Sequence, residues 1–537
     1  MSIEKRTMPL WEVLRRAQIG DYDLLSFHYT FPSYGDTDGN LYPVHAHEAI
    51  EMGSKGSWFY GVPQNPAIDA SLQQARTSLD ETERERLYQD IQWTIHKEVP
   101  FIPLANAPFY SATVKGLEGL HQHPLAYFYD VYANVSKPGL ETLVIAVIID
   151  VYSSSLDPAG LGSGIDRLIT RQIYDGLYNL PADSMEPIPA LATNYTSSDD
   201  MKEWTFSLRQ GVNFHDGTPF NASSVVFTFE RMMNWENTSS EYYSKEWAPK
   251  LSLAYNAIMK SAIKSVEALD PYTVKFSLTN SLPFFLKLLA FPGFAIVSPS
   301  EHIPRYPSDF ATGTGPYEFG KWVAGASITL ERFDGYWGAP AKTQTLIFKV
   351  KQPGSLVVYP HEGAVTDLIA EKVHVLNTHL VAPQDLELIN KTENIELKGP
   401  IGTKFVKSLW INSHREPFSN TASVADPDFS GTTTHGALVR RALAYAIDRE
   451  KIVQEVHNGT GEVPNSAVPS AWPGHNASFE PYSYDPEKAR DILRDLGYAV
   501  KGGETGEEAG FDSFIPIVSI LGAIAFMRVF QKRRRRS

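Results

Sequence analysis

Residues Trp204–Asn234, WTFSLRQGVNFHDGTPFNASSVVFTFERMMN, predict a strand, a tight turn and a helix in succession. In Trp204–Leu208 large apolar side chains alternate with polar ones, a period of two that is typical of a half-buried strand. Asp216–Pro219 has turn chemistry, because Gly tolerates a positive φ and Pro restricts its own φ. Asn221 can cap the following helix, whose apolar side chains recur on one face. This succession occurs in many proteins and by itself indicates no function.

In its detail, however, the stretch resembles one family. It is similar to the segment W-x-F-x-L-R-x-G-V-x-F-x-D-G-x-P-F of the extracellular solute-binding protein family 5, the peptide and oligopeptide receptors of ABC importers. Other segments match this family in its own order: Glu141–Pro158, Gly313–Gly338, Ile347–Leu368, Leu409–Phe418, Leu438–Ile452 and Tyr482–Tyr498. The resemblance implies an α/β, two-lobe, periplasmic-binding-protein-like fold of type II with an extra subdomain.

The first part of the chain also resembles this family, but its C-terminal portion. Trp11–Asn40 and the segments Asn65–Asp69, Glu83–Ile91 and Pro100–Leu104 are similar to late family elements. The order of the chain is therefore that of a circular permutation of one receptor, or of two fused partial receptors. Chain termini often lie close together at the surface of a domain, which makes permutation physically acceptable. One strand-helix unit that follows Tyr498 in the family is expected to be missing.

The resemblance implies the following division of the chain. We expect the crossings between the lobes near Ile102-Pro103 and near Phe348-Lys349. The parts are 1–136 (the end of lobe II and the return to lobe I), 137–140 (linker), 141–346 (lobe I), 347–500 (first part of lobe II), 501–510 (acidic, Gly-rich spacer), 511–531 (transmembrane helix) and 532–537 (basic tail).

The C-terminal end predicts a membrane anchor. Phe511–Phe530 is apolar along most of its length, and a helix of about 20 residues spans about 30 Å. Lys532–Arg536 follows, which by the positive-inside rule places the tail in the cytoplasm and the bulk of the chain outside. A short buried helix is the alternative. Anchored receptors of this kind are typical of archaea, so we expect an archaeal source, although residues 1–20 show no signal-peptide pattern.

Composition limits the class of partner. The formal net charge is −14, which disfavours a nucleic-acid partner because binding to phosphates requires a basic surface. The chain contains no Cys, so it has neither a disulfide framework nor a thiolate metal site. No cofactor is expected.

The resemblance implies three ligand-facing places, and a Pro-rich loop could flank the same cleft. These are the loop 153–156 after the first strand, the strand around residue 410, the turn 34–38 that aligns with an aspartate-containing region of peptide receptors, and the loop around residue 472. The candidate ligand-binding residues are Ser154, Ser155, Trp410, Asn412, Tyr34, Asp36, Asp38 and Trp472.

Each of these candidates also has a structural interpretation. Trp410 fits the core equally well, since aromatic residues dominate both cores and sites. Asp36 and Asp38 are common turn residues that form local hydrogen bonds. Trp472 lies in a Pro-rich loop that it could brace. The sequence leaves both interpretations open.

A metal site is a second possibility, because imidazole and carboxylate groups bind divalent ions. The spacing departs from the H-E-x-x-H pattern, and surface-loop histidines are the simpler interpretation. The residues concerned are His28, His45, His47, Glu48, Glu51, His121 and His123.

The function implied by the resemblance is that of the substrate-binding component of an ABC-type importer. It would bind di- or oligopeptides, or a similar small polar solute, outside the cell and deliver it to permease subunits without performing chemistry. Nickel or haem chelates and oligosaccharides remain open as ligands. The chain has no G-x-S-x-G elbow, P-loop or zinc signature, but a hydrolase or a non-functional rearranged scaffold also stays open.

Overall fold

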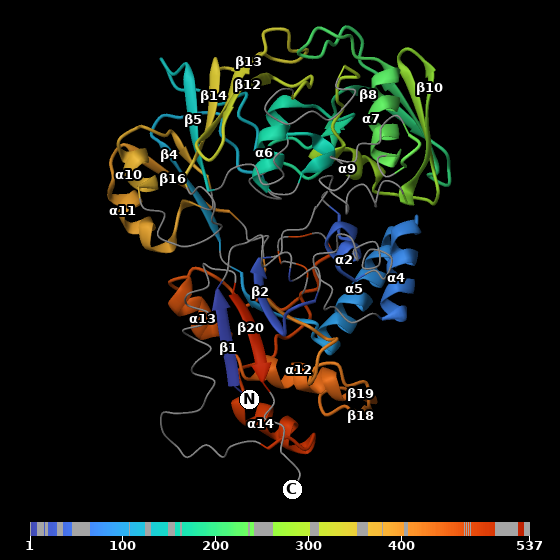
Figure 1. Cartoon of the computed structure of the whole chain (residues 1–537), viewed down its shortest axis with the longest axis vertical. Helices are drawn as coiled ribbons and strands as arrows, with labels where there is room; N and C mark the ends of the chain where they lie inside the picture. Colours follow the sequence, from blue (N-terminus) through green and yellow to red (C-terminus); the bar gives the residue numbers. More distant parts are fainter. Residues whose placement is uncertain are drawn as a thin grey trace.

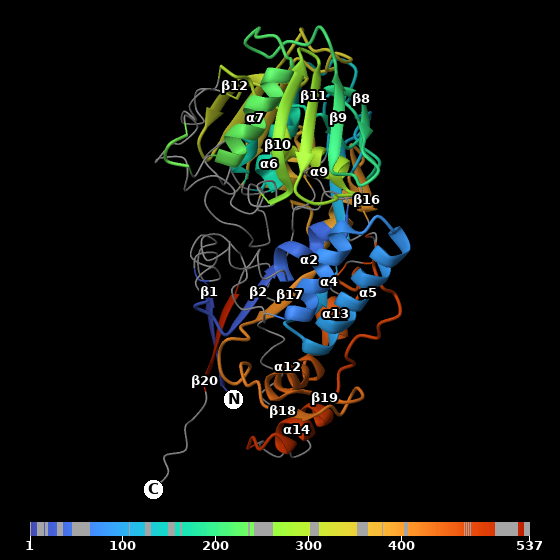
Figure 2. The same ribbon diagram turned by 90° about the vertical axis from the view of Figure 1, so that its right-hand side faces the viewer.

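The computed structural model describes residues 2–7, 16, 20–28, 36–45, 65–106, 108–123, 130–148, 156–161, 164–234, 237–240, 261–300, 311–351, 363–377, 380–401, 406–466, 468, 470, 472, 474–499 and 525–530. They form an upper and a lower lobe, one above the other in Figures 1 and 2.

The upper lobe is built on a seven-stranded sheet with the order β12-β13-β14-β5-β15-β4-β16. In its centre β5 pairs in parallel with both β14 and β15, whereas β4 is antiparallel to β15 and β16. The strands are β4 (Phe109–Val114), β5 (Thr142–Val147), β12 (Tyr317–Val323), β13 (Ser327–Arg332), β14 (Thr345–Val350), β15 (Val375–Leu376) and β16 (Ile395–Ile401). The other elements are α6 (Gly164–Ile173), α9 (Phe285–Leu289), α10 (Ala364–Ile369), α11 (Leu386–Lys391), η3 (Pro158–Gly160), η5 (Pro292–Phe294), η7 (Pro383–Asp385), β6 (Tyr178–Asn179) and β7 (Ile188–Pro189).

A separate four-stranded sheet with the order β10-β11-β9-β8 forms an extra subdomain beside the upper lobe (Figure 2). Its elements are β8 (Ala192–Ser197), β9 (Glu203–Leu208), α7 (Ala222–Asn234), β10 (Ile263–Asp270) and β11 (Thr273–Leu278). Trp204 and Phe206 are buried, and the ring of Phe206 meets Phe276 edge-on at 5.6 Å. Asn221 Oδ1 accepts a hydrogen bond from Ser223 N at 2.9 Å. The predicted strand, turn and helix are therefore confirmed, because their determinants are local.

The lower lobe is built on a five-stranded sheet with the order β1-β20-β2-β17-β3. Its strands are β1 (Ser2–Thr7), β2 (Leu24–His28), β3 (Phe101–Ala105), β17 (Lys407–Ile411) and β20 (Ala525–Phe530), with a hairpin of β18 (Ser423–Ala425) and β19 (Thr432–Thr434). Its helices are α2 (Asp38–His45), α4 (Pro66–Thr77), α5 (Glu81–Glu98), α12 (His435–Tyr445), α13 (Arg449–Val456) and α14 (Pro486–Asp495).

Side chains on the two faces of this sheet enter different cores. Trp410, Leu25 and Phe101 belong to one hydrophobic cluster, whereas Leu409 and Ile411 belong to the other, which includes buried residues of α12 to α14. This alternation follows the period of two along β17. Both faces of the strand are buried, so a polar residue at its end needs partners inside the protein.

The N-terminal part of the chain contributes strands to both lobes. β3 pairs with β17 in the lower sheet, and β4 pairs with β15 and β16 in the upper one. The chain thus crosses between the lobes after β3 and before β4, shortly after the expected crossing near Ile102-Pro103.

The second crossing lies much later than predicted. Because β14 and β15 both pair with β5, and β16 pairs with β4, residues 345–401 belong to the upper sheet. The crossing therefore falls between β16 and β17, and the boundary near Phe348-Lys349 is wrong. The prediction rested on the similarity of Ile347–Leu368 to a family segment. Such a similarity does not show which strands pair, because strand pairing depends on residues far apart in the chain.

The C-terminal end differs from the predicted transmembrane helix in its described residues. Ala525–Phe530 forms β20, which pairs antiparallel with β1 and with β2. The backbone N–H and C=O groups of β20 therefore form hydrogen bonds with neighbouring strands. A short apolar run is compatible with a strand as well as with a helix. The rest of the predicted span 511–531, the spacer 501–510 and the tail 532–537 lie outside the described residues. Within the described part, no helix has the length and apolar character needed to cross a membrane.

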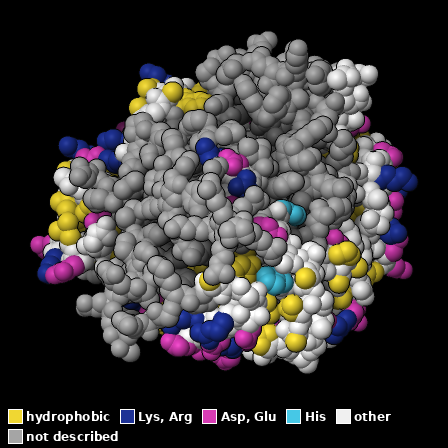
Figure 3. Space-filling model, turned by 60° about the horizontal axis from the view of Figure 1, so that its bottom comes forward, with side chains coloured by type: hydrophobic (Ala, Val, Ile, Leu, Met, Phe, Trp, Pro, Cys, Tyr) yellow, Lys and Arg dark blue, Asp and Glu magenta, His cyan; other side chains and the backbone are white. Residues whose placement is uncertain are grey.

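Charged side chains of both signs are interspersed along the rim of the face shown in Figure 3. One exposed pair on α5 joins Arg86 Nε to Glu83 Oε2 at 2.7 Å. Exposed side chains of Lys and Arg are thus interspersed with those of Asp and Glu on this face.

Candidate ligand-binding region

Asp36 and Asp38 lie at the start of α2, which faces the upper lobe (Figure 1). Both side chains are buried. Asp36 Oδ1 accepts a hydrogen bond from Asp38 N at 2.9 Å, the local bond expected of an aspartate in a turn. The turn therefore brings two carboxylates together in a place with little access to water.

Each of these carboxylates has an arginine partner. Arg84 of α5 forms an ion pair with Asp36, and Arg76 Nε of α4 lies 3.3 Å from Asp38 Oδ1. The hydroxyl of Tyr88 donates to Asp38 Oδ1 at 3.3 Å. Burial by itself would lower the pKa of Arg84, but Asp36 holds that pKa above its ordinary value. A ligand amine would have to compete with these guanidinium groups for the two carboxylates.

Arg84 also reaches the upper lobe. Its guanidinium carbon lies 5.1 Å from the ring centroid of Phe284, the residue that precedes α9. Arg84 Nε donates to Ala75 O at 3.1 Å, and Arg84 Nη2 donates to the hydroxyl of Tyr88 at 3.2 Å. The charge cluster is therefore part of the contact between the lobes. Sequence reasoning did not assign Arg84 or Tyr88 a role, although both stand in the segment that resembles the E-R-x-x-x-Y element of the family.

β17 places Trp410 and Asn412 inside the lower lobe. Trp410 is 2% exposed, and its ring centroid lies 4.5 Å from that of Phe101. Asn412 Nδ2 donates to Gly20 O and to Tyr22 O, both at 2.9 Å, and its Oδ1 accepts from the backbone N of residue 414 at 3.0 Å. The indole of Trp410 is thus packed in the core. The side-chain amide of Asn412 connects the end of β17 to the segment that precedes β2.

Trp472 is buried in a loop that rests on the Asp36–Asp38 turn. Gly474 in this loop has φ +74°, and a Cβ there would lie 2.4 Å from Thr37 Oγ1. Gln92 of α5 donates from Nε2 to Gly474 O at 2.7 Å. Trp472 and Trp410 belong to the same hydrophobic cluster. The structure therefore brings the turn and this loop together, with both tryptophans directed into the protein.

The remaining predicted residues, Ser154, Ser155 and Tyr34, lie outside the described residues. The described end of the serine loop is held in place: Arg231 of α7 donates to both carboxylate oxygens of Asp157, at 2.7 and 2.8 Å. Asp157 Oδ1 also accepts from Ala159 N at 3.0 Å. The loop thus joins the upper lobe at an anchored position.

Within the described part of the chain, no group of three or more His, Asp or Glu residues is placed to hold a metal ion. His45 is buried, and burial lowers its pKa to about 3. A ring nitrogen of His123 lies 2.9 Å from Ser184 O. The other members of the predicted cluster, His47, Glu48, Glu51 and the side chain of His28, lie outside the described residues.

Residues 186–518, more than half of the chain, match the family described as bacterial extracellular solute-binding proteins, family 5 Middle. The chain belongs to this family. The glutathione-binding protein GsiB of Salmonella typhi is 29% identical over 368 residues, which cover 67% of this chain and 63% of that protein. GsiB of Escherichia coli K12 is 27% identical over 359 residues, covering 66% of this chain and 61% of that protein. The chain thus spans less than two thirds of the length of these relatives.

Solved structures of solute-binding proteins share this fold. The binding protein DppA of Helicobacter pylori, in complex with the peptide STSA, is 26% identical with a TM-score of 0.54, over 66% of each chain. A dipeptide-binding protein of Pseudoalteromonas sp. SM9913, in complex with Met-Leu, has 22% identity and a TM-score of 0.52, over 66% of this chain and 67% of that one, which shows the fold alone.

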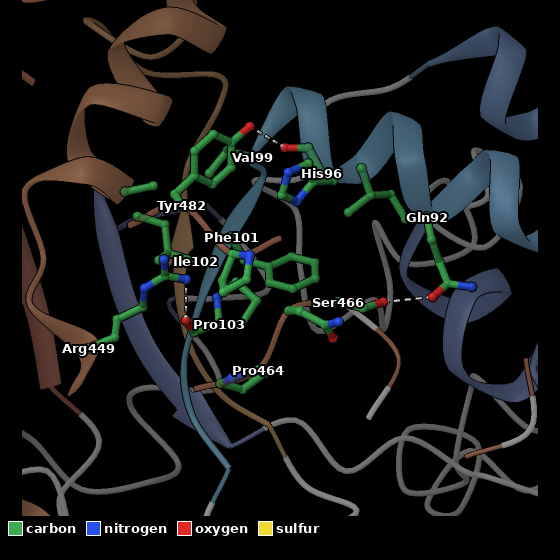
Figure 4. Close-up of a pocket in the computed structure, with 14 residues that line it drawn as sticks. Gln92, His96, Val99, Phe101, Ile102, Pro103, Arg449, Pro464, Ser466 and Tyr482 are labelled. Atoms are coloured by element: carbon green, nitrogen blue, oxygen red, sulfur yellow. Dashed lines mark hydrogen bonds between the residues drawn. The ribbon is translucent and has the colours of Figure 1, made fainter. Parts of the chain in front are cut away.

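This solute-binding protein also has a small cavity inside its lower lobe, between α5, β3 and α13 (Figure 4). Its volume is about 30 Å³. Pockets that hold small-molecule ligands usually measure roughly 300–1,000 Å³. The cavity is therefore too small to be the receptor's solute site.

Proposed function

We propose that this chain is the substrate-binding component of an ABC-type importer, and that it binds di- or oligopeptides outside the cell and delivers them to a membrane permease. The observation that carries this proposal is the likeness in fold and sequence to DppA, solved with a bound tetrapeptide, at 26% identity and a TM-score of 0.54. The glutathione-binding relatives support a peptide-like ligand as well.

The architecture supports a mechanism of lobe closure. The two sheets lie in two lobes, which are joined between β3 and β4 and between β16 and β17. This arrangement suits a hinge motion around an extended ligand. Affinity would come mainly from hydrogen bonds to the peptide backbone. We assign direct ligand contact to Ser154, Ser155 and Tyr34. We assign a supporting role in shaping the lower lobe to Asp36, Asp38, Trp410, Asn412 and Trp472, because all five are buried.

The permuted order is part of the proposal. β3 lies beside β17, and β4 lies between β15 and β16, so residues 1–136 supply strands to both sheets. One chain would then contribute strands to both lobes of the receptor. The proposal does not include the C-terminal anchor, since Ala525–Phe530 forms a strand. The archaeal source stays a prediction from the sequence.

A ligand screen on the full chain tests this function. A ligand that binds only the native state raises the melting temperature in a saturable manner. We expect such a shift with dipeptides, longer peptides or glutathione, and no conversion of the peptide by mass spectrometry. If the melting temperature rose only with oligosaccharides, or only with nickel or haem chelates, the ligand would belong to that class and not to the peptides. Turnover of the peptide would overturn the assignment as a binding protein.

A further inference from the structure

Arg449, the first residue of α13, is a buried cation without an ion-pair partner among the described residues. It is 5% exposed. Its Nη1 donates to Pro103 O at 3.5 Å, a long and therefore weak hydrogen bond. In contrast, Arg441 Nη1 lies 2.6 Å from Asp426 Oδ1. Arg440 donates two short hydrogen bonds to backbone carbonyls, to Glu98 O at 2.8 Å and to Phe418 O at 2.7 Å. A buried charge is costly unless it is paired and hydrogen-bonded, so Arg449 requires an explanation.

Arg449 lines the cavity of the lower lobe. It enters from α13 on one side, while Gln92 and Ser466 lie on the opposite side (Figure 4). Ser466 Oγ donates to Gln92 Oε1 at 2.7 Å, so these two groups satisfy each other. Asn465 and His96 also line the cavity and add polar atoms to its wall.

None of the ionisable side chains that line the cavity carries a negative charge. Glu450, the next residue of α13, is exposed, and its charge opposes the effect of burial on the pKa of Arg449, but among the described residues it forms no ion pair with Arg449. Burial lowers the pKa of His96 to about 4, and the nearby charges of Arg441 and Arg449 act in the same direction, so its ring is neutral near pH 7. The hydroxyl of Tyr482 donates to His96 O at 2.9 Å, and burial raises its pKa, so it is neutral as well. Burial lowers the pKa of Arg449 to about 10, which leaves it protonated at neutral pH.

We propose that this cavity binds a small monovalent anion, of the halide class, on the guanidinium of Arg449. A volume of about 30 Å³ holds one or two particles of the size of water, which suits chloride. The anion compensates the buried charge and stabilises the packing of α13 against β3 and α5. This site is distinct from the peptide-binding function and does not depend on it.

Thermal unfolding of the full chain in different sodium salts, at matched ionic strength, tests the site. We expect sodium chloride and bromide to raise Tm by about 2–4 °C over sodium gluconate, with saturation. The Arg449→Gln variant should lose this halide-specific shift. The matched control is Arg494→Gln, which changes an arginine that is exposed on α14 and should keep the shift. General salt effects act on all three proteins alike.

An equal halide shift in Arg449→Gln, or no halide-specific shift in the wild type, would overturn the proposal. If the Arg449→Gln variant does not fold, X-ray diffraction from wild-type crystals grown in sodium bromide tests the site instead. An anomalous bromide peak beside Arg449 supports the site, and water density without such a peak refutes it.

Discussion

The guanidinium carbon of Arg84 lies 5.1 Å from the ring centroid of Phe284, so a side chain of the lower lobe stacks on an aromatic ring of the upper lobe. The same arginine forms an ion pair with Asp36. A single residue thus compensates a buried carboxylate and contacts the opposite lobe. This arrangement connects the stability of the lower lobe with the contact between the lobes.

Replacing Arg84 by Ala should destabilise the protein by about 3 kcal/mol, because it leaves the buried carboxylate of Asp36 without its partner. The measurement is the free energy of unfolding from denaturant titration. Arg86→Ala is the matched control on the same helix, since the side chain of Arg86 is 55% exposed. It should change stability by less than about 0.5 kcal/mol. Equal effects of the two substitutions would contradict the role of the buried pair.

Trp410→Ala should destabilise the ligand-free protein by about 3–5 kcal/mol, the range for truncating a fully buried aromatic residue. Its packing on Phe101 would be lost. Trp93→Ala provides the comparison, because Trp93 is 39% exposed, and it should cost clearly less. If Trp410→Ala instead weakened peptide binding and left the unfolding midpoint unchanged, Trp410 would be a ligand contact.

Asn412→Ala should cost about 2–3 kcal/mol of stability, because it removes the hydrogen bonds to the carbonyls of Gly20 and Tyr22 inside the protein. Asn390→Ala, at an exposed position of α11, should change stability by less than about 0.5 kcal/mol. Denaturant titration of both variants is the test. A small effect of Asn412→Ala would mean that the segment before β2 does not need this connection.

Asp130 predicts a dependence of stability on pH. Burial raises its pKa from 3.8 to about 8, although a hydrogen bond from His123 N opposes the change. The folded chain therefore keeps this proton up to about pH 8, whereas the unfolded chain releases it near its ordinary value. Because the folded state binds more protons in this window, its stability falls as pH rises from about 4 to about 8.

Asp130→Asn removes the titrating group and should reduce this fall. Relative to the wild type, the variant should gain on the order of 2 kcal/mol between pH 5 and pH 8. Unfolding free energies at both pH values measure the difference. The exposed Asp183→Asn serves as control and should show the dependence of the wild type. A parallel pH dependence of wild type and Asp130→Asn would show that Asp130 does not titrate in this window.

The parts of the fold that were predicted correctly depend on neighbouring residues. The alternation in Trp204–Leu208, the turn at Asp216–Pro219 and the cap at Asn221 act over a few positions, and β9 and α7 form as expected. The family and its two-lobe architecture also followed from the order of such segments. For the candidate ligand-binding residues, type and spacing did not show whether a side chain is buried, and their contact with a ligand stays a prediction.

The sequence by itself determined the family, the α/β class and the elements whose signals are local. Only the tertiary structure decided that residues 345–401 stay in the upper sheet, that Ala525–Phe530 pairs with β1 and β2, and that Trp410 and Asn412 are buried. It also decided that Arg84 contacts both Asp36 and Phe284, and that Arg449 has no ion-pair partner among the described residues. The physical reason is that strand pairing and the partners of buried charges depend on groups far apart in the chain, and packing alone brings them together.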